Sequence, residues 1–183
     1  NVVSATTRPL CLPHPRLVLQ RDQGQYPPLS AAERSPAMLA FLDARLVLLS
    51  VPKTGTTALE EALAPHAQLA LRGRAEIKHL TLAQYHARIA PILRAIPGPP
   101  FRTVAVIREP QSWLDSWYRY RTRPQLAGRP RSTAGIGFAQ FVEEYLAPDP
   151  RPARAALGRQ SGFLDPGKGA GVDLLVAAAQ TVE

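Results

Sequence analysis

Short apolar runs, separated by glycine, proline and polar residues, dominate the pattern of this chain. The run over 46–51 has the length and aliphatic content of a buried parallel strand. Behind it, Leu59 and Leu63 are four residues apart, which predicts the apolar face of a helix. A second run over 102–107 predicts another core strand, followed by an aromatic helix that extends through Tyr120. The pattern therefore predicts two strand–helix units.

Weaker patterns predict further elements and a division of the chain. The expected elements are a short helix over 37–42, a strand over 67–71, a helix over 81–95 capped by Thr81, an amphipathic helix over 137–146 and a strand over 172–176. Six prolines before residue 37 predict an extended arm rather than a long helix. We therefore expect a proline-rich arm over 1–37 and one α/β domain over 38–183.

The break between the first strand and its helix, at residues 52–57, predicts an anion-binding turn. The helix is expected to begin at Thr56 or Thr57, and its first amides lack partners within the helix and carry the positive end of its dipole. Gly55 permits a close backbone approach, and Lys53 adds a full charge. The turn is not a Walker A loop, because the lysine precedes the glycine and no Gly-Lys-Ser/Thr follows. We expect a phosphate or sulfate group here.

A second anion contact is predicted after the other strand. Arg108 follows that strand directly, Pro110 suits the first turn of a helix, and Ser116 lies eight positions beyond the arginine. A planar guanidinium can donate two hydrogen bonds to a phosphate. A hydroxyl two helical turns along can reach the same group.

Together the two segments resemble the sulfotransferase family, over roughly residues 40 to 165. Its members carry Pro-Lys-Ser/Thr-Gly-Ser/Thr-Ser/Thr after the first strand, and an arginine and a serine spaced as here. The resemblance implies a three-layer P-loop-like fold, with a central parallel sheet and helices on both faces. It implies 3′-phosphoadenosine 5′-phosphosulfate (PAPS) as donor and adenosine 3′,5′-bisphosphate (PAP) as product. The residues that it implies as donor contacts are Lys53, Thr54, Gly55, Thr56 and Thr57 at the 5′-phosphosulfate, and Arg108 and Ser116 at the 3′-phosphate.

Sulfuryl transfer needs a base for the proton of the acceptor. His79 is our first candidate, because it follows the predicted second strand, where a turn would face the ligand crevice of an open α/β sheet. Glu76 is the second candidate, and Lys78 would stabilise charge or bind the acceptor. Lys53 would neutralise charge on the departing oxygen. The sequence shows no cluster with metal-ligand spacing, so no metal is expected.

Charge adds a preference for anionic partners. The formal net charge is +8, and arginine supplies 19 of the 22 basic residues, although coding bias is an equally good explanation for most of them. The segment 118–132 holds five arginines and is predicted to be a loop that forms an acceptor or lid surface. The acceptor is open between a carbohydrate, a lipid, a small alcohol and a peptide tyrosine, with an anionic compound or a carbohydrate favoured, and no specific nucleic-acid partner is expected. Its identity and the oligomeric state are left open.

Further observations bear on the compartment. Cys11 is the single cysteine, so no disulfide forms within the chain. No apolar run approaches the ~18 residues of a membrane span. A cytoplasmic location is expected, with an upstream targeting or anchor segment left open because the chain starts at Asn1.

The end of the chain departs from the family pattern. Relatives continue beyond the strand predicted over 172–176, so the domain is expected to be short or trimmed. The segment 167–169 is interpreted as a hairpin turn. Two alternatives therefore stay open: a non-catalytic nucleotide or polyanion-binding relative, and an NTP-binding, kinase-like enzyme.

Overall fold

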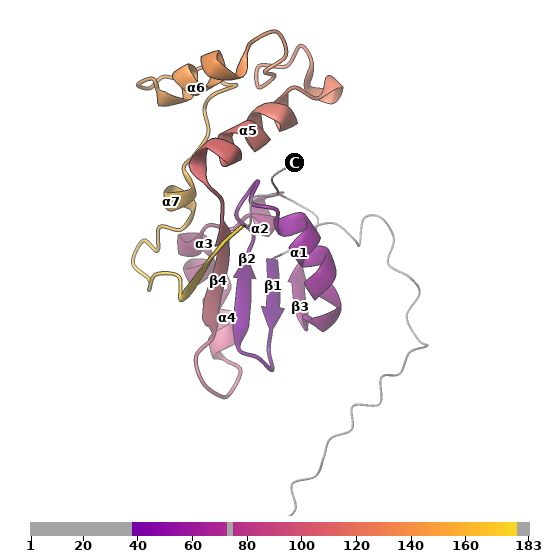
Figure 1. Cartoon of the computed structure of the whole chain (residues 1–183). Coiled ribbons are helices and arrows are strands. Elements are labelled where there is room, and N and C mark those ends of the chain that lie inside the picture. Colours follow the sequence, from indigo (N-terminus) through magenta and orange to yellow (C-terminus); the bar gives the residue numbers. More distant parts are fainter. Residues whose placement is uncertain (1–37, 73–74, 179–183) are drawn as a thin grey trace, which may run out of the picture.

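The computed structural model describes residues 38–72 and 75–178, with only the backbone of Ala75 and Glu76. Its centre is a five-stranded sheet with the strand order β3-β1-β2-β4-β5 (Figure 1). The strands are β1 (Met38–Phe41), β2 (Leu46–Leu49), β3 (Leu69–Leu71), β4 (Arg102–Ile107) and β5 (Leu174–Ala177). The proline-rich arm predicted over 1–37 lies outside the described residues.

Helices follow most of the strands. They are α1 (Thr56–Leu63), α2 (Ala75–Lys78), α3 (Leu82–Arg88), α4 (Ala90–Arg94), α5 (Pro110–Arg121), α6 (Phe138–Leu146) and α7 (Gln160–Phe163), with short 3₁₀ turns η1 (Ala64–His66) and η2 (Pro124–Leu126). The two predicted strand–helix units are thus present as β2–α1 and β4–α5. The chain is an α/β protein.

The sheet is mixed, so the expected parallel sheet is wrong. Strand β2 is parallel to β4 and β4 is parallel to β5, but β1 is antiparallel to both of its neighbours. The short helix predicted over 37–42 is also wrong, because Met38–Phe41 within this range form β1. Leu39 pairs with Leu48 on one side and with Ala70 on the other. An apolar run of this length suits either structure, and the two neighbouring strands decide it by supplying hydrogen-bond partners.

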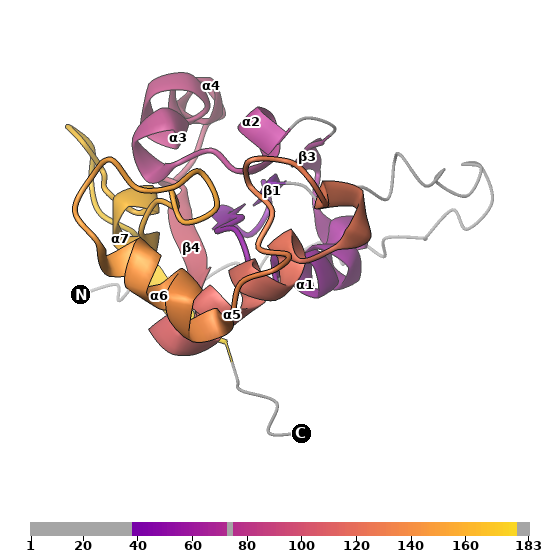
Figure 2. The same ribbon diagram turned by 90° about the horizontal axis from the view of Figure 1, so that it is seen from above.

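Helices cover both faces of the sheet, because successive side chains of a strand point to opposite faces. Val47 and Leu49 belong to a core that includes Leu82 and Leu93 of α3 and α4. Leu48, between them, belongs to a second core with α1 and η1. Figure 2 shows α1 on one side of the sheet, with α3 and α4 on the other.

A third core joins α5 and α6 above the carboxyl ends of β2 and β4 (Figure 1). It contains Trp113 and Leu114 of α5, Phe141 of α6, and Ala155 and Leu157 of the following segment. These buried contacts pack α5 against α6 and the segment that follows it. The amphipathic helix predicted over 137–146 is confirmed as α6.

Two other predictions need adjustment. The helix predicted over 81–95 is divided into α3 and α4, with Pro91 in the first turn of α4, where its missing N–H is tolerated. Its predicted cap is confirmed, since Thr81 and Gln84 form a reciprocal capping box. The strand predicted over 172–176 is β5, but it is parallel to β4. The turn at 167–169 therefore connects α7 to a parallel strand and is not a hairpin turn.

Candidate functional site

The turn between β2 and α1 has the backbone features that an anion-binding loop is expected to have. Gly55 is the N-cap of α1, with φ of 80°, and no side chain caps this helix. The first turn of α1 contains no acidic residue. Lys53 also has a positive φ, 66°, which is unusual for a residue with a side chain. The N-terminal amides of α1 are therefore left for another partner.

The threonines of this loop differ in their roles. Thr54 is buried, and its hydroxyl donates to the carbonyl of Val51 at 3.0 Å. Thr56 is also buried, whereas Thr57 is exposed and lines a cavity together with Lys53. The hydroxyl of Thr54 is thus used within the loop.

Helix α5 is hydrogen-bonded to this turn. The indole Nε1 of Trp113 donates to the carbonyl of Pro52 at 2.9 Å. The α5 terminus differs from that of α1, because the Glu109 carboxylate accepts bonds from the amides of Gln111 and Ser112. These two bonds lower the pKa of Glu109. The start of α5 is therefore already occupied by a carboxylate, and the start of α1 is the one suited to an anion.

The predicted second anion contact lies on the same cavity. Arg108 follows β4, and Ser116 lies in α5. The backbone N–H and carbonyl of Arg108 both bond to the Gln160 side chain, at 2.9 and 2.8 Å. The Arg108 Nε donates to Ser112 Oγ at 2.6 Å. These contacts orient the arginine through its backbone and its Nε and leave its terminal nitrogens as further donors.

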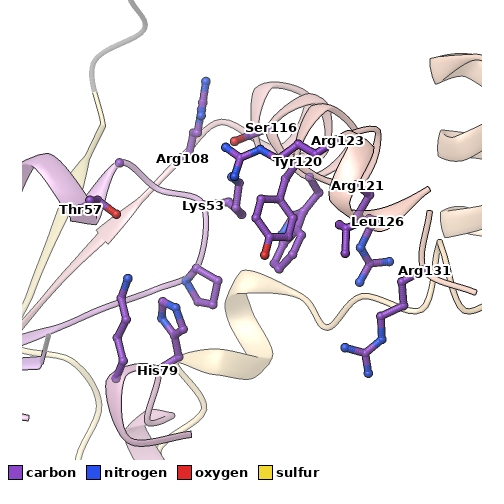
Figure 3. Close-up of a pocket in the computed structure, with 14 residues that line it drawn as sticks. Lys53, Thr57, His79, Arg108, Ser116, Tyr120, Arg121, Arg123, Leu126 and Arg131 are labelled. Carbon is purple, nitrogen blue, oxygen red and sulfur yellow. The ribbon is translucent and has the colours of Figure 1, made fainter. Parts of the chain in front are cut away.

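Lys53 and Gly55 of the turn, together with Arg108 and Ser116, line one cavity of about 670 Å³ (Figure 3). It is lined by Pro52, Lys53, Gly55, Thr57, Lys78, His79, Arg108, Ser116, Trp117, Tyr120, Arg121, Arg123, Leu126 and Arg131. Within the described part of the chain, no aspartate or glutamate lines it. The cavity is therefore strongly cationic.

His79 lines the cavity, and a backbone group holds its ring. Its Nδ1 lies 2.6 Å from the carbonyl oxygen of Ser50. Since a carbonyl can only accept, Nδ1 carries the proton and Nε2 keeps its lone pair. Burial lowers the pKa of His79, the bond to Ser50 opposes this shift, and nearby Lys78 lowers the pKa further. The imidazole is therefore neutral at pH 7.

A buried carboxylate organises the surroundings of His79. The hydroxyl of Ser50 donates to Glu60 of α1. Glu60 also lies 3.8 Å from the ammonium of Lys78, and the two side chains are 2% and 15% exposed. The residue that follows β2 and the last residue of α2 thus both contact Glu60 of α1. The backbone of Glu76, the second candidate base, lies in α2, but its side chain is outside the described residues.

Two cations share one aromatic ring in the cavity. The Lys53 Nζ lies 4.6 Å from the centroid of the Tyr120 ring, and the Arg123 guanidinium carbon lies 4.8 Å from it. Burial lowers the pKa of Lys53, and the nearby charges of Arg123 and Arg108 lower it further. An anion bound beside Lys53 would oppose this lowering, because a negative charge favours the ammonium form.

The arginine-rich segment predicted as a loop over 118–132 begins with helix, because α5 continues to Arg121. Arg121 is buried, stacks over the Trp117 ring and donates to two carbonyls, those of Ala153 and Arg154. Its role is structural, because these carbonyls tie α5 to the segment after α6. Arg123 and Arg131 are exposed and line the cavity.

Sequence reasoning missed the contributions of the α5 aromatics. Trp113, Trp117 and Tyr120 occupy positions i, i+4 and i+7 of α5 and so share one face of the helix. Ser116 is four residues before Tyr120 and lies on the cavity too. The helical spacing of these residues was a signal that could have placed Tyr120 at the site.

Among the described residues, no group of three or more histidines, cysteines, aspartates and glutamates could hold a metal ion. In the same part of the chain, no helix has both the length and the apolar character needed to cross a membrane. Comparisons of the chain with protein-family models, with curated proteins and with solved structures found no match.

Proposed function

We propose that this protein is a sulfotransferase that moves a sulfuryl group from PAPS to a hydroxyl or amine acceptor. One observation carries the proposal: the uncapped start of α1 with Lys53, the pair Arg108 and Ser116, and His79 all meet at a single cationic cavity. The two strands that lead to these segments, β2 and β4, are adjacent and parallel. Their carboxyl ends therefore meet at one edge, where open α/β sheets bind ligands.

The arrangement also supports a P-loop-like architecture in three layers. Helix α1 packs on one face of the sheet, and α3 and α4 pack on the other. The anion-binding turn directly follows a central strand, as in folds that hold phosphate at a helix start. The antiparallel strand β1 extends the sheet on the side away from β4, so it leaves this site unaltered.

Different residues of the cavity would contact the two ends of the donor. Lys53 and the amides of residues 54–57 face the 5′-phosphosulfate, where a helix start and an ammonium attract negative charge. Arg108 and Ser116 face the 3′-phosphate. The bond from Arg108 Nε to Ser112 holds the guanidinium in place before the ligand arrives, which reduces the cost of ordering it.

In the transfer step, an acceptor oxygen or nitrogen attacks sulfur and forms a new bond to it. The bond between sulfur and the bridging oxygen breaks, and its electron pair stays on the 5′-phosphate of PAP. Nε2 of His79 takes the acceptor proton, because its lone pair is kept by the bond from Nδ1 to Ser50. Lys53 neutralises the charge that grows on the departing oxygen.

The two alternatives have less support from the site. A kinase-like enzyme needs carboxylates to hold Mg²⁺ beside its nucleotide, and no described carboxylate lines this cavity. A protein that only binds polyanions needs positive charge at its surface, and the neutral imidazole of His79 supplies none.

The decisive experiment compares three nucleotides by thermal unfolding. PAP should stabilise the protein by about 2.7 kcal/mol at a hundredfold excess over its dissociation constant. Adenosine 5′-monophosphate and ATP at the same concentration should stabilise it less. Arg108→Gln should remove this preference, because only Arg108 and Ser116 are proposed to contact the 3′-phosphate. Arg102→Gln, at the opposite end of β4, is the matched control and should keep the preference.

Two outcomes would contradict the proposal. Equal stabilisation by all three nucleotides would show that no 3′-phosphate site exists. A preference for ATP that requires Mg²⁺ would favour the NTP-binding alternative.

A further inference from the structure

The cationic cavity extends beyond the groups needed for the donor. Figure 3 shows Thr57 and Arg108 on one side of Lys53 and Tyr120, with Leu126 and Arg131 on the other. These last two residues come from the segment that follows α5. The part of the cavity lined by Tyr120, Arg123, Leu126 and Arg131 is here termed the distal half.

The cations of the cavity differ in the partners that they already have. Arg121 is held by two backbone carbonyls, and Lys78 faces the carboxylate of Glu60. For Arg123, the described contact is the ring of Tyr120, which also faces Lys53. Two positive groups at one ring repel each other, and no described cavity residue supplies a negative charge. The distal half therefore favours an anion.

The donor alone does not account for this positive charge. Lys53 and the start of α1 serve one end of PAPS, and Arg108 serves the other. Arg131 lies on a loop after α5 and is not among the residues that the donor is proposed to contact. A second molecule in the cavity must be the acceptor, which has to approach His79.

We propose that Arg123 and Arg131 bind an acidic group of the acceptor, a carboxylate, sulfate or phosphate, close to the hydroxyl or amine that is sulfated. This inference rests on the proposed function, since it assigns the second substrate of the same cavity. Guanidinium groups suit such planar or tetrahedral anions because they donate paired hydrogen bonds. Leu126 and the Tyr120 ring offer apolar surface for the remainder of the acceptor.

The test uses matched acceptors that differ in charge. The pairs are galactose and galacturonate, 4-hydroxybenzyl alcohol and 4-hydroxybenzoate, and N-acetylglucosamine and N-acetylglucosamine 6-phosphate. Each compound is titrated calorimetrically into the full chain saturated with PAP, so that binding is measured without turnover. We expect the acidic member to bind more tightly in at least one pair, with an advantage that shrinks as salt is raised.

Variants then assign the advantage to the two arginines. Arg123→Gln and Arg131→Gln should each lower the affinity for the acidic member of a pair roughly tenfold or more, and should leave the affinity for the neutral member unchanged. Arg131→Lys should recover part of the loss, because the charge is restored. Arg129→Gln is the matched control, since Arg129 is exposed on the same loop but does not line the cavity.

The possible failures can be told apart. If the wild-type chain does not bind PAP, the proposed function is wrong, whatever the acceptor panel shows. If PAP binds but the neutral member binds as tightly as the acidic member in every pair, the anionic acceptor is wrong and the donor site stands. An equal loss in Arg129→Gln and Arg131→Gln would show general surface attraction and would also overturn the inference.

Discussion

Replacing His79 in two ways separates its structural bond from its chemistry. The substitution His79→Asn keeps a nitrogen donor near the position of Nδ1, so the bond to the Ser50 carbonyl can persist. His79→Ala removes both the bond and the base. Only the histidine offers an unprotonated nitrogen to the cavity.

The two effects differ in size. A neutral hydrogen bond contributes about 1 kcal/mol to stability, and an unsatisfied buried carbonyl costs about 1–3 kcal/mol, so His79→Ala should unfold more easily by that amount. His79→Asn should stay within about 1 kcal/mol of the wild type. A general base contributes roughly 10²- to 10⁴-fold to rate, or about 2.7–5.5 kcal/mol, so both variants should lose that factor.

The assay measures transfer of labelled sulfate from PAPS to an acceptor from the matched panel, as a function of pH. Because burial lowers the pKa of His79, the acid limb of kcat/KM should lie below the ordinary value of about 6.5. Activity should be full above that limb and fall as His79 becomes protonated.

Stability should follow the same sign. Between the unfolded pKa and the lower native pKa, the unfolded chain binds the proton first, so the free energy of unfolding falls as pH falls through this window. His79→Asn should flatten the dependence. Full activity in His79→Asn, together with a wild-type acid limb, would refute the assignment of the base and direct attention to Glu76.

Two further perturbations test the walls of the cavity. Lys53→Ala should slow sulfuryl transfer, because it removes about 2–4 kcal/mol of transition-state stabilisation, and should lower the affinity for PAP in calorimetric titrations. Lys168→Ala, in the turn before β5, is the control and should change neither quantity. Unchanged PAP affinity and rate in Lys53→Ala would count against the site. Trp113→Phe removes the indole donor to the Pro52 carbonyl and should lower the free energy of unfolding by about 1–3 kcal/mol in urea denaturation, with weaker PAP binding. Unchanged stability and binding would mean that this bond does not hold the loop.

Local patterns were sufficient for much of the fold. The strand over 102–107 and the capping residue Thr81 were identified from neighbours within a few positions, and the structure confirms both. The stretch 37–42 was assigned wrongly as a helix, because the short apolar run within it suits either structure. Its strand form depends on β2 and β3, which pair with it from elsewhere in the chain.

The site shows the same division. Lys53, Arg108 and Ser116 were named from motif spacing, and the structure brings them to one cavity. Their roles toward a ligand stay a prediction. The stacking of Arg123 on Tyr120 and the two carbonyls that hold Arg121 depend on how α5 packs, which no short pattern encodes. Local patterns therefore assign both arginines the same exposed role.

The left-handed backbone of Lys53 has a consequence for protein engineering. A residue with a side chain in this region costs the folded state about 1–2 kcal/mol, and glycine avoids that cost. Glycine also gives the unfolded chain more conformational freedom, which destabilises the fold by about 0.4–1 kcal/mol, less than the cost that it avoids. Selection for thermal stability alone would thus favour glycine at this position and discard the ammonium. A mutant library that is selected for stability should therefore keep residue 53 as lysine. The substitution that relieves the backbone strain also removes the charge that the proposed donor site needs.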